Sequence, residues 1–333
     1  MASQGPRNIL VTGGAGFIGS HLVDKLLAHG DRVTVLDNFD EYYSAEIKRD
    51  NIRQHRGQAN CKLVEGDLRH EAALQQVFRG EPFDVIIHLA AMAGVRPSLE
   101  NPALYMDVNV NGTQNIIDFT LKHSPKARFV FGSSSSVYGG NRDGDSFKET
   151  DRVDRPFSPY AASKAANELQ CYAAHHTTGL QFVCLRFFTV FGPRQRPDLA
   201  IHKFAAKIER GEQIDVFGDG TSKRDYTFVH DIVQGIEAAT QAHLTNGFEI
   251  INLGRSEPVV LMDMIKSIEK ALGKEARIAH KPFQTGDVPY TYASIDKARQ
   301  LLGYNPKTPF DEGIKQFVDW YRARLDTTLP LRQ

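Results

Sequence analysis

Two residues four positions apart carry side chains that can move a proton together: Tyr160 and Lys164, in the stretch SPYAASKAANE at residues 158–168. Residues at this spacing lie on one face of a helix, so the two side chains are expected to be neighbours. A free tyrosine has a pKa of about 10, so only about 0.1% of it is ionised at pH 7. A nearby ammonium group favours the phenolate. Tyr160 is therefore a candidate general base, with Lys164 lowering its pKa.

A row of serines at residues 133–136 follows a short apolar run in FVFGSSSSVYGG. If this run is a strand of a parallel sheet, it delivers the serines to the carboxyl edge of the sheet, where ligands bind in such folds. A hydroxyl group at that edge can hydrogen-bond the reacting oxygen beside Tyr160. No acidic residue stands among the serines.

A glycine-rich segment, VTGGAGFIGSHL at residues 11–22, joins the first expected strand to the first expected helix. Glycines at these spacings permit a tight turn, close approach of the backbone to a pyrophosphate, and close contact between helix and sheet. The position between strand and helix favours a dinucleotide site over a simple turn. The expected contacts are Gly13, Gly16, Phe17, Ile18 and Gly19.

Asp37 ends the second expected strand, where a carboxylate can accept both ribose hydroxyls of an adenosine and would repel a 2′-phosphate. Residues 38–47 contain no Arg or Lys, so NAD is expected rather than NADP; the alternative for Asp37 is a turn residue. Asp67 lies where the adenine edge is expected, and it is equally compatible with a capping role for the following helix. The ends of the neighbouring strands add Asn38, Asp67, Leu68, Leu89, Ala90 and Ala91.

Apolar strands alternate with helical stretches over the first part of the chain, which predicts a Rossmann-type α/β fold with a doubly wound parallel sheet. Helices are expected at 17–29, 70–80, 101–122 and 158–177. Strands are expected at 8–12, 32–37, 61–67, 83–91, 127–133 and 180–188.

Past residue 189 Pro and Gly become frequent and the expected elements shorten, which indicates a smaller α/β substrate-binding domain. We expect the NAD-binding Rossmann domain at residues 1–188, with 229–248 returning to it. The second domain is expected at 189–228 and 249–333.

Composition narrows the class of protein. The 333 residues contain 40 Lys plus Arg and 40 Asp plus Glu, so no basic field is available for nucleic acid or an anionic membrane. The three cysteines form no CxxC pair, which disfavours a disulfide framework or zinc site and fits a reducing, cytoplasmic compartment. The chain starts with polar residues and has no long apolar run, so we expect neither a signal peptide nor a membrane span. No metal site is expected, and His175 and His176 are expected to be solvated.

The chain resembles the extended short-chain dehydrogenase/reductase superfamily, and within it the nucleotide-sugar epimerases and dehydratases. This resemblance covers nearly the whole chain and implies that Ser134 and Tyr160 are catalytic, with Lys164 holding the nicotinamide ribose of NAD. It also implies a homodimer that pairs the helices at 101–122 and 158–177, and it makes the second domain the one that binds the nucleotide sugar. The residues that carry it are Gly13, Gly16, Gly19, Asp37, Ser134, Tyr160 and Lys164.

The serine row bears on the type of reaction. The sugar 4,6-dehydratases of this superfamily carry Asp-Glu directly after the catalytic Thr, and those acids eliminate water. Here the two positions are Ser135 and Ser136. Serine cannot supply that acid/base pair, so an epimerase or a decarboxylase is expected instead.

Several stretches resemble the UDP-glucuronate 4-epimerases in particular: residues 36–49, 94–102, 185–204 and 286–293. Thr189 and Gln284 stand where UDP-galactose-type epimerases usually carry Asn and Arg. A uronate needs groups that hold a carboxylate, and Arg196 offers a planar fork for it, although an ion pair is the alternative. The expected sugar-nucleotide contacts are Ser134, Ser135, Ser136, Thr189, Arg196, Arg96, the diphosphate-binding Arg224 and the ribose-binding Asp287.

The resemblance implies reversible oxidation at C4 of a UDP-sugar. Tyr160 removes the O4 proton as hydride passes to NAD, the 4-keto sugar presents its other face, and hydride returns. The expected reaction converts UDP-glucuronate to UDP-galacturonate. The alternatives are a UDP-glucose 4-epimerase, a UDP-glucuronate decarboxylase and, in a different class, a non-catalytic NAD(H)-binding module.

Overall fold

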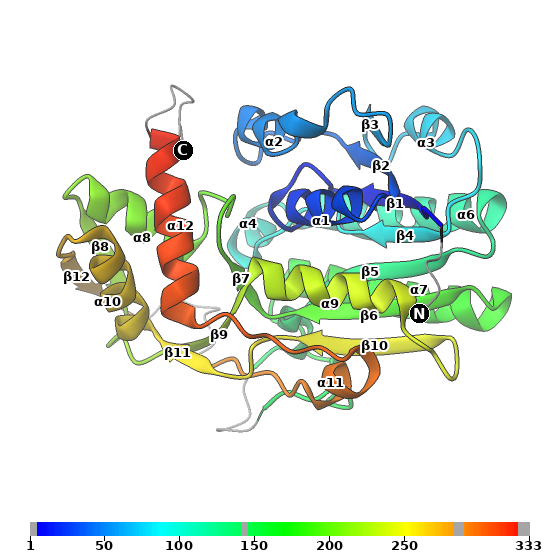
Figure 1. Cartoon of the computed structure of the whole chain (residues 1–333). Helices are drawn as coiled ribbons and strands as arrows, with labels where there is room; N and C mark the ends of the chain where they lie inside the picture. The colour runs from blue at the N-terminus through cyan, green and yellow to red at the C-terminus, as the bar shows by residue number, and fades with distance from the viewer. Residues whose placement is uncertain (1–4, 141–145, 283–289, 326–333) are drawn as a thin grey trace.

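A seven-stranded parallel sheet forms the centre of the molecule in the computed structural model, which describes residues 5–140, 146–282 and 290–325 (Figure 1). The strand order is β10-β6-β5-β4-β1-β2-β3, and it reverses direction between β1 and β4. This arrangement confirms the predicted Rossmann-type α/β fold. The strands are β1 (Asn8–Thr12), β2 (Arg32–Asp37), β3 (Cys61–Glu65), β4 (Val85–His88), β5 (Arg128–Ser134), β6 (Gln181–Phe187) and β10 (Phe248–Leu253).

Helices cover both faces of the sheet because its strands are apolar on both sides. In β1, Ile9 and Val11 belong to one buried cluster and Leu10 to the other. The first cluster includes α1 (Phe17–Ala28) and α9 (Val229–Gln241). The second includes α3 (Glu71–Val77), α6 (Gly112–His123) and α7 (Pro159–Thr178).

The predicted helix at 101–122 is not one regular helix. It consists of α5 (Pro102–Tyr105), a π-helical turn η2 (Met106–Asn111), and α6. The Asn109 carbonyl accepts a hydrogen bond from Asn167 of α7 (2.9 Å), and its side chain binds the main chain of Met92. These contacts with α7 and with Met92 accompany the local change from α-helical to π-helical hydrogen bonding. The spacing of apolar residues in the sequence does not reveal that change. Short helices that were not predicted include α2 (Ala45–Asn51), α4 (Val95–Glu100) and the 3₁₀ turns η1 (Arg53–His55) and η3 (Ser135–Tyr138).

The smaller part of the molecule lies beyond the carboxyl edge of the sheet (Figure 1). It has a three-stranded sheet in the order β11-β9-β7 and a pair, β12-β8. Its elements are β7 (Thr189–Phe191), α8 (Ala200–Glu209), β8 (Gln213–Phe217), β9 (Lys223–Phe228), β11 (Pro258–Val260), α10 (Leu261–Leu272), β12 (Arg277–Lys281) and α12 (Phe310–Leu325). The remaining helix, α11 (Asp296–Leu302), packs on α9 and β10 of the larger part.

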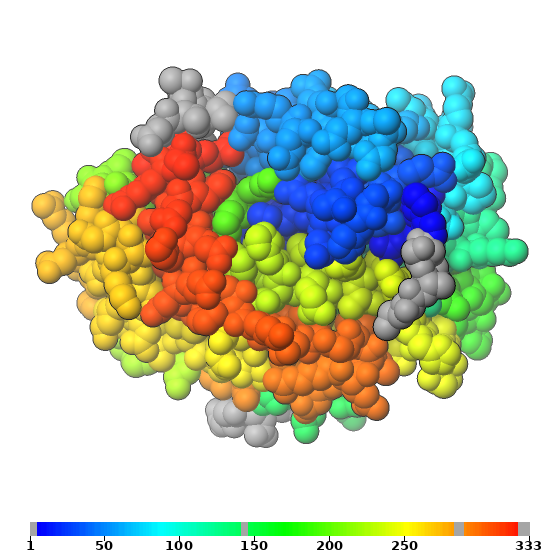
Figure 2. All heavy atoms as spheres, viewed as in Figure 1, coloured from blue at the N-terminus to red at the C-terminus, as the bar shows by residue number. Residues whose placement is uncertain are grey.

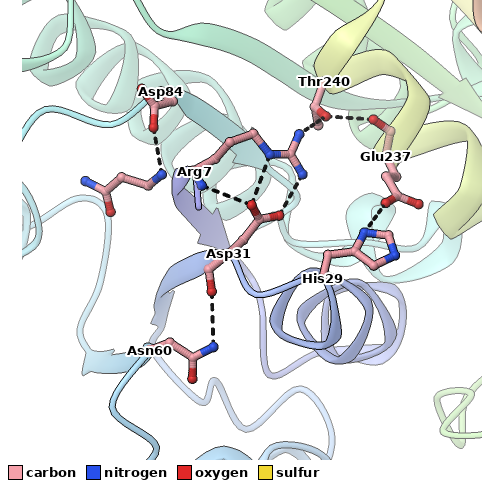
Figure 3. A network of polar contacts seen from close by, with 8 residues as sticks. Arg7, His29, Asp31, Asn60, Asp84, Glu237 and Thr240 are labelled. Atoms are coloured by element: carbon pink, nitrogen blue, oxygen red, sulfur yellow. Dashed lines mark hydrogen bonds and ion pairs between the residues drawn. The ribbon is translucent and has the colours of Figure 1, made fainter. Parts of the chain in front are cut away.

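The chain returns from the smaller part to the large sheet through α9 and β10. The return runs to Leu253, beyond the boundary expected at residue 248, because β10 pairs with β6 along its whole length. Figure 2 shows α9 at the surface between the N-terminal elements and α11. Arg7 ties this return to the start of β1: it binds Asp31 through Nε (3.1 Å) and Nη2 (2.6 Å) and donates to Thr240 (2.8 Å) (Figure 3).

Candidate active site

A cavity of about 500 Å³ opens at the carboxyl edge of the large sheet, where the strand order reverses. Ligands bind at this point in doubly wound folds. The structure brings every predicted cofactor residue to its wall: Gly13, Gly16, Phe17, Ile18, Gly19, Asp37, Asn38, Asp67, Leu68, Leu89, Ala90, Ala91, Tyr160 and Lys164.

The predicted sugar-nucleotide residues divide into two groups. Those in the cavity wall are Ser134, Ser135, Ser136, Thr189 and Arg196.

Two other predicted contacts, Arg96 and Arg224, are not brought to this cavity: neither is among the described residues that line it. The Arg96 guanidinium lies over the Phe217 ring, 5.6 Å from its centroid, and Arg224 donates to the Lys223 carbonyl (2.9 Å). Asp287 lies outside the described residues, as does Gln284. The roles of Arg96, Arg224 and Asp287 in binding the nucleotide sugar therefore stay predictions.

The glycine turn is built by contacts that leave no room for side chains. Gly13 has φ +71°, and a Cβ there would lie 2.8 Å from the Ala90 nitrogen. A Cβ on Gly19 would lie 2.1 Å from the Gly13 carbonyl oxygen. Helix α1 starts directly after Gly16, and no side chain caps it. Its first N–H groups therefore remain available to an anion in the cavity.

The carboxylate of Asp37 links the glycine turn after β1 to the loop after β2. It accepts hydrogen bonds from the main-chain nitrogens of Ala15 (3.0 Å) and Phe39 (2.9 Å). Burial raises its pKa, which these two hydrogen bonds and the Lys48 ammonium oppose. The carboxylate is thus a structural part of the glycine turn as well as part of the cavity wall.

The side chain of Asp67 does not cap the following helix, because His70 holds the N-cap position of α3. Asp67 instead accepts from Arg69 (2.8 and 3.0 Å) and from Asn38 (3.1 Å). The hydrogen bonds from Arg69 are the largest cause that lowers its pKa to about 2. The prediction of a capping role is therefore wrong, and the ionised carboxylate is part of the cavity wall.

The catalytic candidates come from the end of β5 and the first turns of α7. Ser158 caps α7 by accepting from the Ala161 nitrogen (3.1 Å). Two turns of this helix then present Tyr160 and Lys164 to the same cavity. Ser134, the last residue of β5, lines the same cavity beside the Tyr160 phenol and donates to the Ser136 hydroxyl (3.0 Å).

Charges around this pair differ from the sequence-based expectation. Burial raises the pKa of Tyr160, and the groups that lower it are the Ser134 hydrogen bond and the positive charge of Arg196. Lys164 is buried and donates to the Gly132 carbonyl (2.7 Å) rather than to Tyr160. Burial lowers the pKa of Lys164 to about 8.

Arg196 lines the cavity and forms an ion pair, which was the alternative interpretation of this residue. Its role in binding the sugar stays a prediction. Its Nε and Nη2 bind the two oxygens of Asp198 (2.9 and 2.7 Å). Tyr42, in the loop after β2, donates to the same carboxylate (3.1 Å). This bidentate pairing directs the fork of Arg196 at Asp198 and fixes the orientation of its remaining Nη1.

Two buried histidines hold the loop that carries Arg196. His21 of α1 donates to the Pro193 carbonyl (2.8 Å), and His202 of α8 donates to the Gln195 carbonyl (2.8 Å). Burial lowers the pKa of each imidazole to about 4, so both are neutral at pH 7. The loop is therefore fastened on one side to the dinucleotide helix and on the other to the smaller part of the molecule.

Sequence reasoning missed several groups in or beside the cavity. Tyr42, Tyr43 and Lys48 line it from the segment after β2, and Lys48 lies one position past the stretch that contained no Lys or Arg. Asp198, which pairs with Arg196, stands only two residues after it. A search for carboxylates at short spacing from each candidate Arg would have found this last residue.

Within residues 5–140, 146–282 and 290–325, no group of three or more His, Cys, Asp and Glu side chains is placed to hold a metal ion. His175 donates to the Leu180 carbonyl (2.9 Å) and is partly buried, whereas His176 is exposed. The described helices include none with the length and apolar character needed to cross a bilayer.

Residues 10–317 match the family model described as GDP-mannose 4,6 dehydratase. The chain belongs to this family. Its membership confirms the predicted extended short-chain dehydrogenase/reductase. Within the GDP-mannose 4,6 dehydratase family, the chain is 38% identical to the UDP-glucuronate 4-epimerase of Thermodesulfobacterium geofontis, over 95% of this chain and 97% of that protein.

Two solved structures similar to this member of the family hold NAD. The UDP-glucuronic acid 4-epimerase of Bacillus cereus, in complex with UDP-glucuronic acid and NAD, has a TM-score of 0.89 and 34% identity, covering 95% of this chain and 99% of that one. The UDP-glucose 4-epimerase of Thermus thermophilus, in complex with NAD, has a TM-score of 0.85 and 33% identity, with the same coverage. The sequence identities to these two neighbours are nearly equal, so they do not distinguish between the two sugars. That distinction must come from the residues of the site.

Proposed function

We propose that the chain is an NAD-dependent 4-epimerase that converts UDP-glucuronate to UDP-galacturonate through a 4-keto sugar. The observation that carries this proposal is the composition of one cavity wall. Hydroxyl groups of residues 134–136 and Thr189, together with Arg196, lie in the same cavity as Tyr160 and the glycine turn. The carboxylates that line this cavity in the described residues are Asp37, Asp40 and Asp67, and all lie at or after the ends of β2 and β3. Ser135 and Ser136, which directly follow β5, stand where the family resemblance places the acid pair of a dehydratase.

The glycine turn supports NAD as the cofactor. Side chains at Gly13 and Gly19 would collide with backbone atoms, and the uncapped start of α1 offers N–H groups to a diphosphate. The Asp37 carboxylate, at the end of β2, is suited to an adenosine ribose and unsuited to a 2′-phosphate. Lys164 would hold the nicotinamide ribose, as the family resemblance implies.

The residues of the chain then perform the proton chemistry. NAD, when bound, supplies a reversible hydride acceptor for C4 and a positive ring that favours the phenolate. Tyr160 removes the proton from O4 of the sugar and later returns it. Ser134, whose hydroxyl lowers the pKa of the phenol, is placed to hydrogen-bond the same sugar oxygen in both steps. The hydroxyls of Ser135, Ser136 and Thr189 are suited to receiving the sugar carboxylate.

Holding that carboxylate matters because a uronate oxidised at C4 is a β-keto acid, which loses carbon dioxide readily. An epimerase must keep the carboxylate in an orientation that disfavours cleavage of its carbon–carbon bond. The fixed Nη1 of Arg196, set by Asp198 and the two histidines, supports such a restraint.

The test is NMR analysis of the products formed from purified protein with UDP-glucuronate and, separately, with UDP-glucose. We expect UDP-galacturonate from the first and far slower turnover of the second, because the polar wall would face a neutral hydroxymethyl group. Fast exchange of UDP-glucose with UDP-galactose and an inert uronate would contradict the proposal. A UDP-pentose as main product would identify a decarboxylase, and absence of turnover on all UDP-sugars would identify a binding module.

We also propose a homodimer formed through η2 and α7. Three apolar side chains of these elements are exposed: Met106 (38%), Leu169 (72%) and Tyr172 (53%). Large exposed apolar side chains on neighbouring helices are typical of an interface. Light scattering should give twice the chain mass for the wild type and the mass of one chain for Leu169→Glu; a monomeric wild type would contradict the dimer.

The division into an NAD-binding part and a nucleotide-sugar-binding part remains a proposal. In it, β10 (Phe248–Leu253) belongs to the NAD-binding part. A cytoplasmic location is also a proposal. It is supported by the three cysteines, which are all free thiols in the described residues.

A further inference from the structure

Three polar side chains from three different elements meet in the interior at the cavity wall, to which Ser133 itself belongs. Ser133 of β5, Glu168 of α7 and Arg186 of β6 are 3%, 4% and 2% exposed. Ser133 donates to Oε1 of Glu168 (2.6 Å). Arg186 binds the same carboxylate in bidentate fashion, through Nε to Oε1 (2.9 Å) and Nη2 to Oε2 (2.7 Å).

Each member of this triad is adjacent to a group of the candidate active site. Ser133 immediately precedes Ser134, and Glu168 lies one helical turn after Lys164 on α7. The Arg186 guanidinium lies over the ring of Tyr138, 4.7 Å from its centroid. Tyr138 is the last residue of η3, the turn that carries the other serines of the cavity wall.

Stability alone is a poor reason for such an arrangement. Removing two charges from water costs several kcal/mol per ion, and apolar residues of similar volume often stabilise a fold as well or better. Breaking one partner of such a pair, however, is strongly destabilising. A buried bidentate pair does fix geometry, because the planar guanidinium and the carboxylate accept only a narrow range of relative orientations.

We propose that Glu168 is a positioning residue of the epimerase reaction: through Ser133 and Arg186 it sets helix α7, with Tyr160 and Lys164, against the strand end that carries Ser134. The inference rests on the proposed function and adds a residue that does not touch the substrate. Catalysis by Tyr160 needs a near-fixed distance to the sugar oxygen, and a misplacement of about 1 Å costs on the order of a hundredfold in rate.

The carboxylate has a second effect, through charge. The titratable groups that face Lys164 are Glu168 and Cys171 of α7 and His88 of β4. Burial lowers the pKa of Lys164, and Cys171 and Glu168 oppose this effect. Burial lowers the pKa of His88 to about 3, so the imidazole is neutral. Glu168 therefore keeps Lys164 protonated, as a donor to a ribose, to higher pH than burial alone permits.

The test compares Glu168→Gln with a matched control at the other end of the sheet, Asp31→Asn. Asp31 is also buried and also forms a bidentate pair with an arginine, Arg7 (Figure 3). It directly precedes β2, at the amino edge of the sheet, whereas the cavity opens at the carboxyl edge. Both variants leave a buried guanidinium without its carboxylate, so both are expected to lower the melting temperature. The readouts are kcat, KM, bound NAD and the pH profile of kcat.

For Glu168→Gln we expect kcat to fall at least about tenfold, with KM and bound NAD within about twofold of the wild type. We also expect the alkaline limb of the pH profile to move to lower pH, because neutral Lys164 appears earlier. Asp31→Asn should keep the wild-type kcat and pH profile. The proposal would be overturned if the two variants had the same kcat and if neither moved the alkaline limb, although both lost similar amounts of melting temperature.

If Glu168→Gln does not fold, Ser133→Ala tests the same positioning without breaking the ion pair. It should lower kcat with the alkaline limb unmoved, and Ser133→Thr should restore kcat; wild-type kcat in Ser133→Ala would overturn the proposal. All ratios are taken against wild type on whichever UDP-sugar it turns over. A wild type without activity would therefore count against the proposed function, not against the role of Glu168.

Discussion

The substitution Gly19→Ala gives a direct test of how the glycine turn is built. Gly19 lies inside α1, and in an ordinary helix interior Ala is more favourable than Gly by up to about 1 kcal/mol. Helix propensity alone therefore predicts a stabilised protein. The structure predicts the opposite, because the added Cβ would lie 2.1 Å from the Gly13 carbonyl oxygen and 2.8 Å from the Gly14 Cα.

These contacts are clearly shorter than the roughly 3.5 Å at which such atoms pack. Both partners are backbone atoms, so α1 must move away from the turn. Overpacking of this kind costs about 1–3 kcal/mol, which exceeds the gain in propensity. We expect a lower free energy of unfolding and, because the turn is displaced, at least about tenfold weaker NAD binding, equivalent to roughly 1.4 kcal/mol.

The assay is urea unfolding followed by calorimetric titration with NAD, and the matched control is Gly16→Ala. A Cβ on Gly16 would lie 3.2 Å from the Gly13 carbonyl oxygen, which needs only a small adjustment. This control should unfold within about 1 kcal/mol of the wild type and still bind NAD poorly, because its methyl group projects into the cavity. A Gly19→Ala protein that is as stable as the wild type and binds NAD normally would refute the reasoning.

Four further outcomes are expected. Tyr160→Phe should leave folding and NAD binding nearly intact and reduce turnover at least about a hundredfold; half-retained activity would remove it from the mechanism. Asp37→Asn should weaken NAD binding in a titration, and unchanged affinity would leave Asp37 a purely structural residue. Arg196→Ala should slow epimerisation and release a pentose detectable by NMR, whereas an unchanged product ratio would contradict its role in holding the carboxylate. Because burial lowers the pKa of His21 and His202 to about 4, the unfolded chain binds protons there first, so stability should fall as pH drops from about 6.5 to 4. His202→Gln should show a shallower fall in urea unfolding, and an identical slope would contradict this assignment.

Features set by neighbouring residues in the chain were predictable from sequence. The spacing of Tyr160 and Lys164 follows from helix geometry, and the turn at Gly13 follows from steric limits on the backbone. Strands β1 and β2 have the predicted bounds, because each is a short, largely apolar run in the sequence. Apolar periodicity and turn chemistry depend on only a few consecutive residues, and that information is enough to predict these features.

Features that depend on distant partners were not predictable in the same way. Tyr42 meets Asp198 only because the chain brings the loop after β2 beside the loop after β7. The π-helical turn at residues 106–111 reflects contacts of Asn109 with α7 and with Met92, neither of which leaves a pattern in local sequence. Lys164 donates to a strand carbonyl rather than acting directly on the phenol, which depends on the depth at which α7 packs.

The return of the chain to the sheet through β10 has a consequence for synthesis of the protein. During translation, the catalytic groups of β5 and α7 and the whole of β6 leave the ribosome before β10 exists. Until Leu253 has emerged, β6 is an unpaired sheet edge whose central residues, Phe182 to Leu185, are fully buried in the finished fold. Exposed apolar edges of this kind pair with other chains. A fragment that stops after residue 228 therefore contains every catalytic residue yet should aggregate, and the sheet completes only when the returning segment arrives.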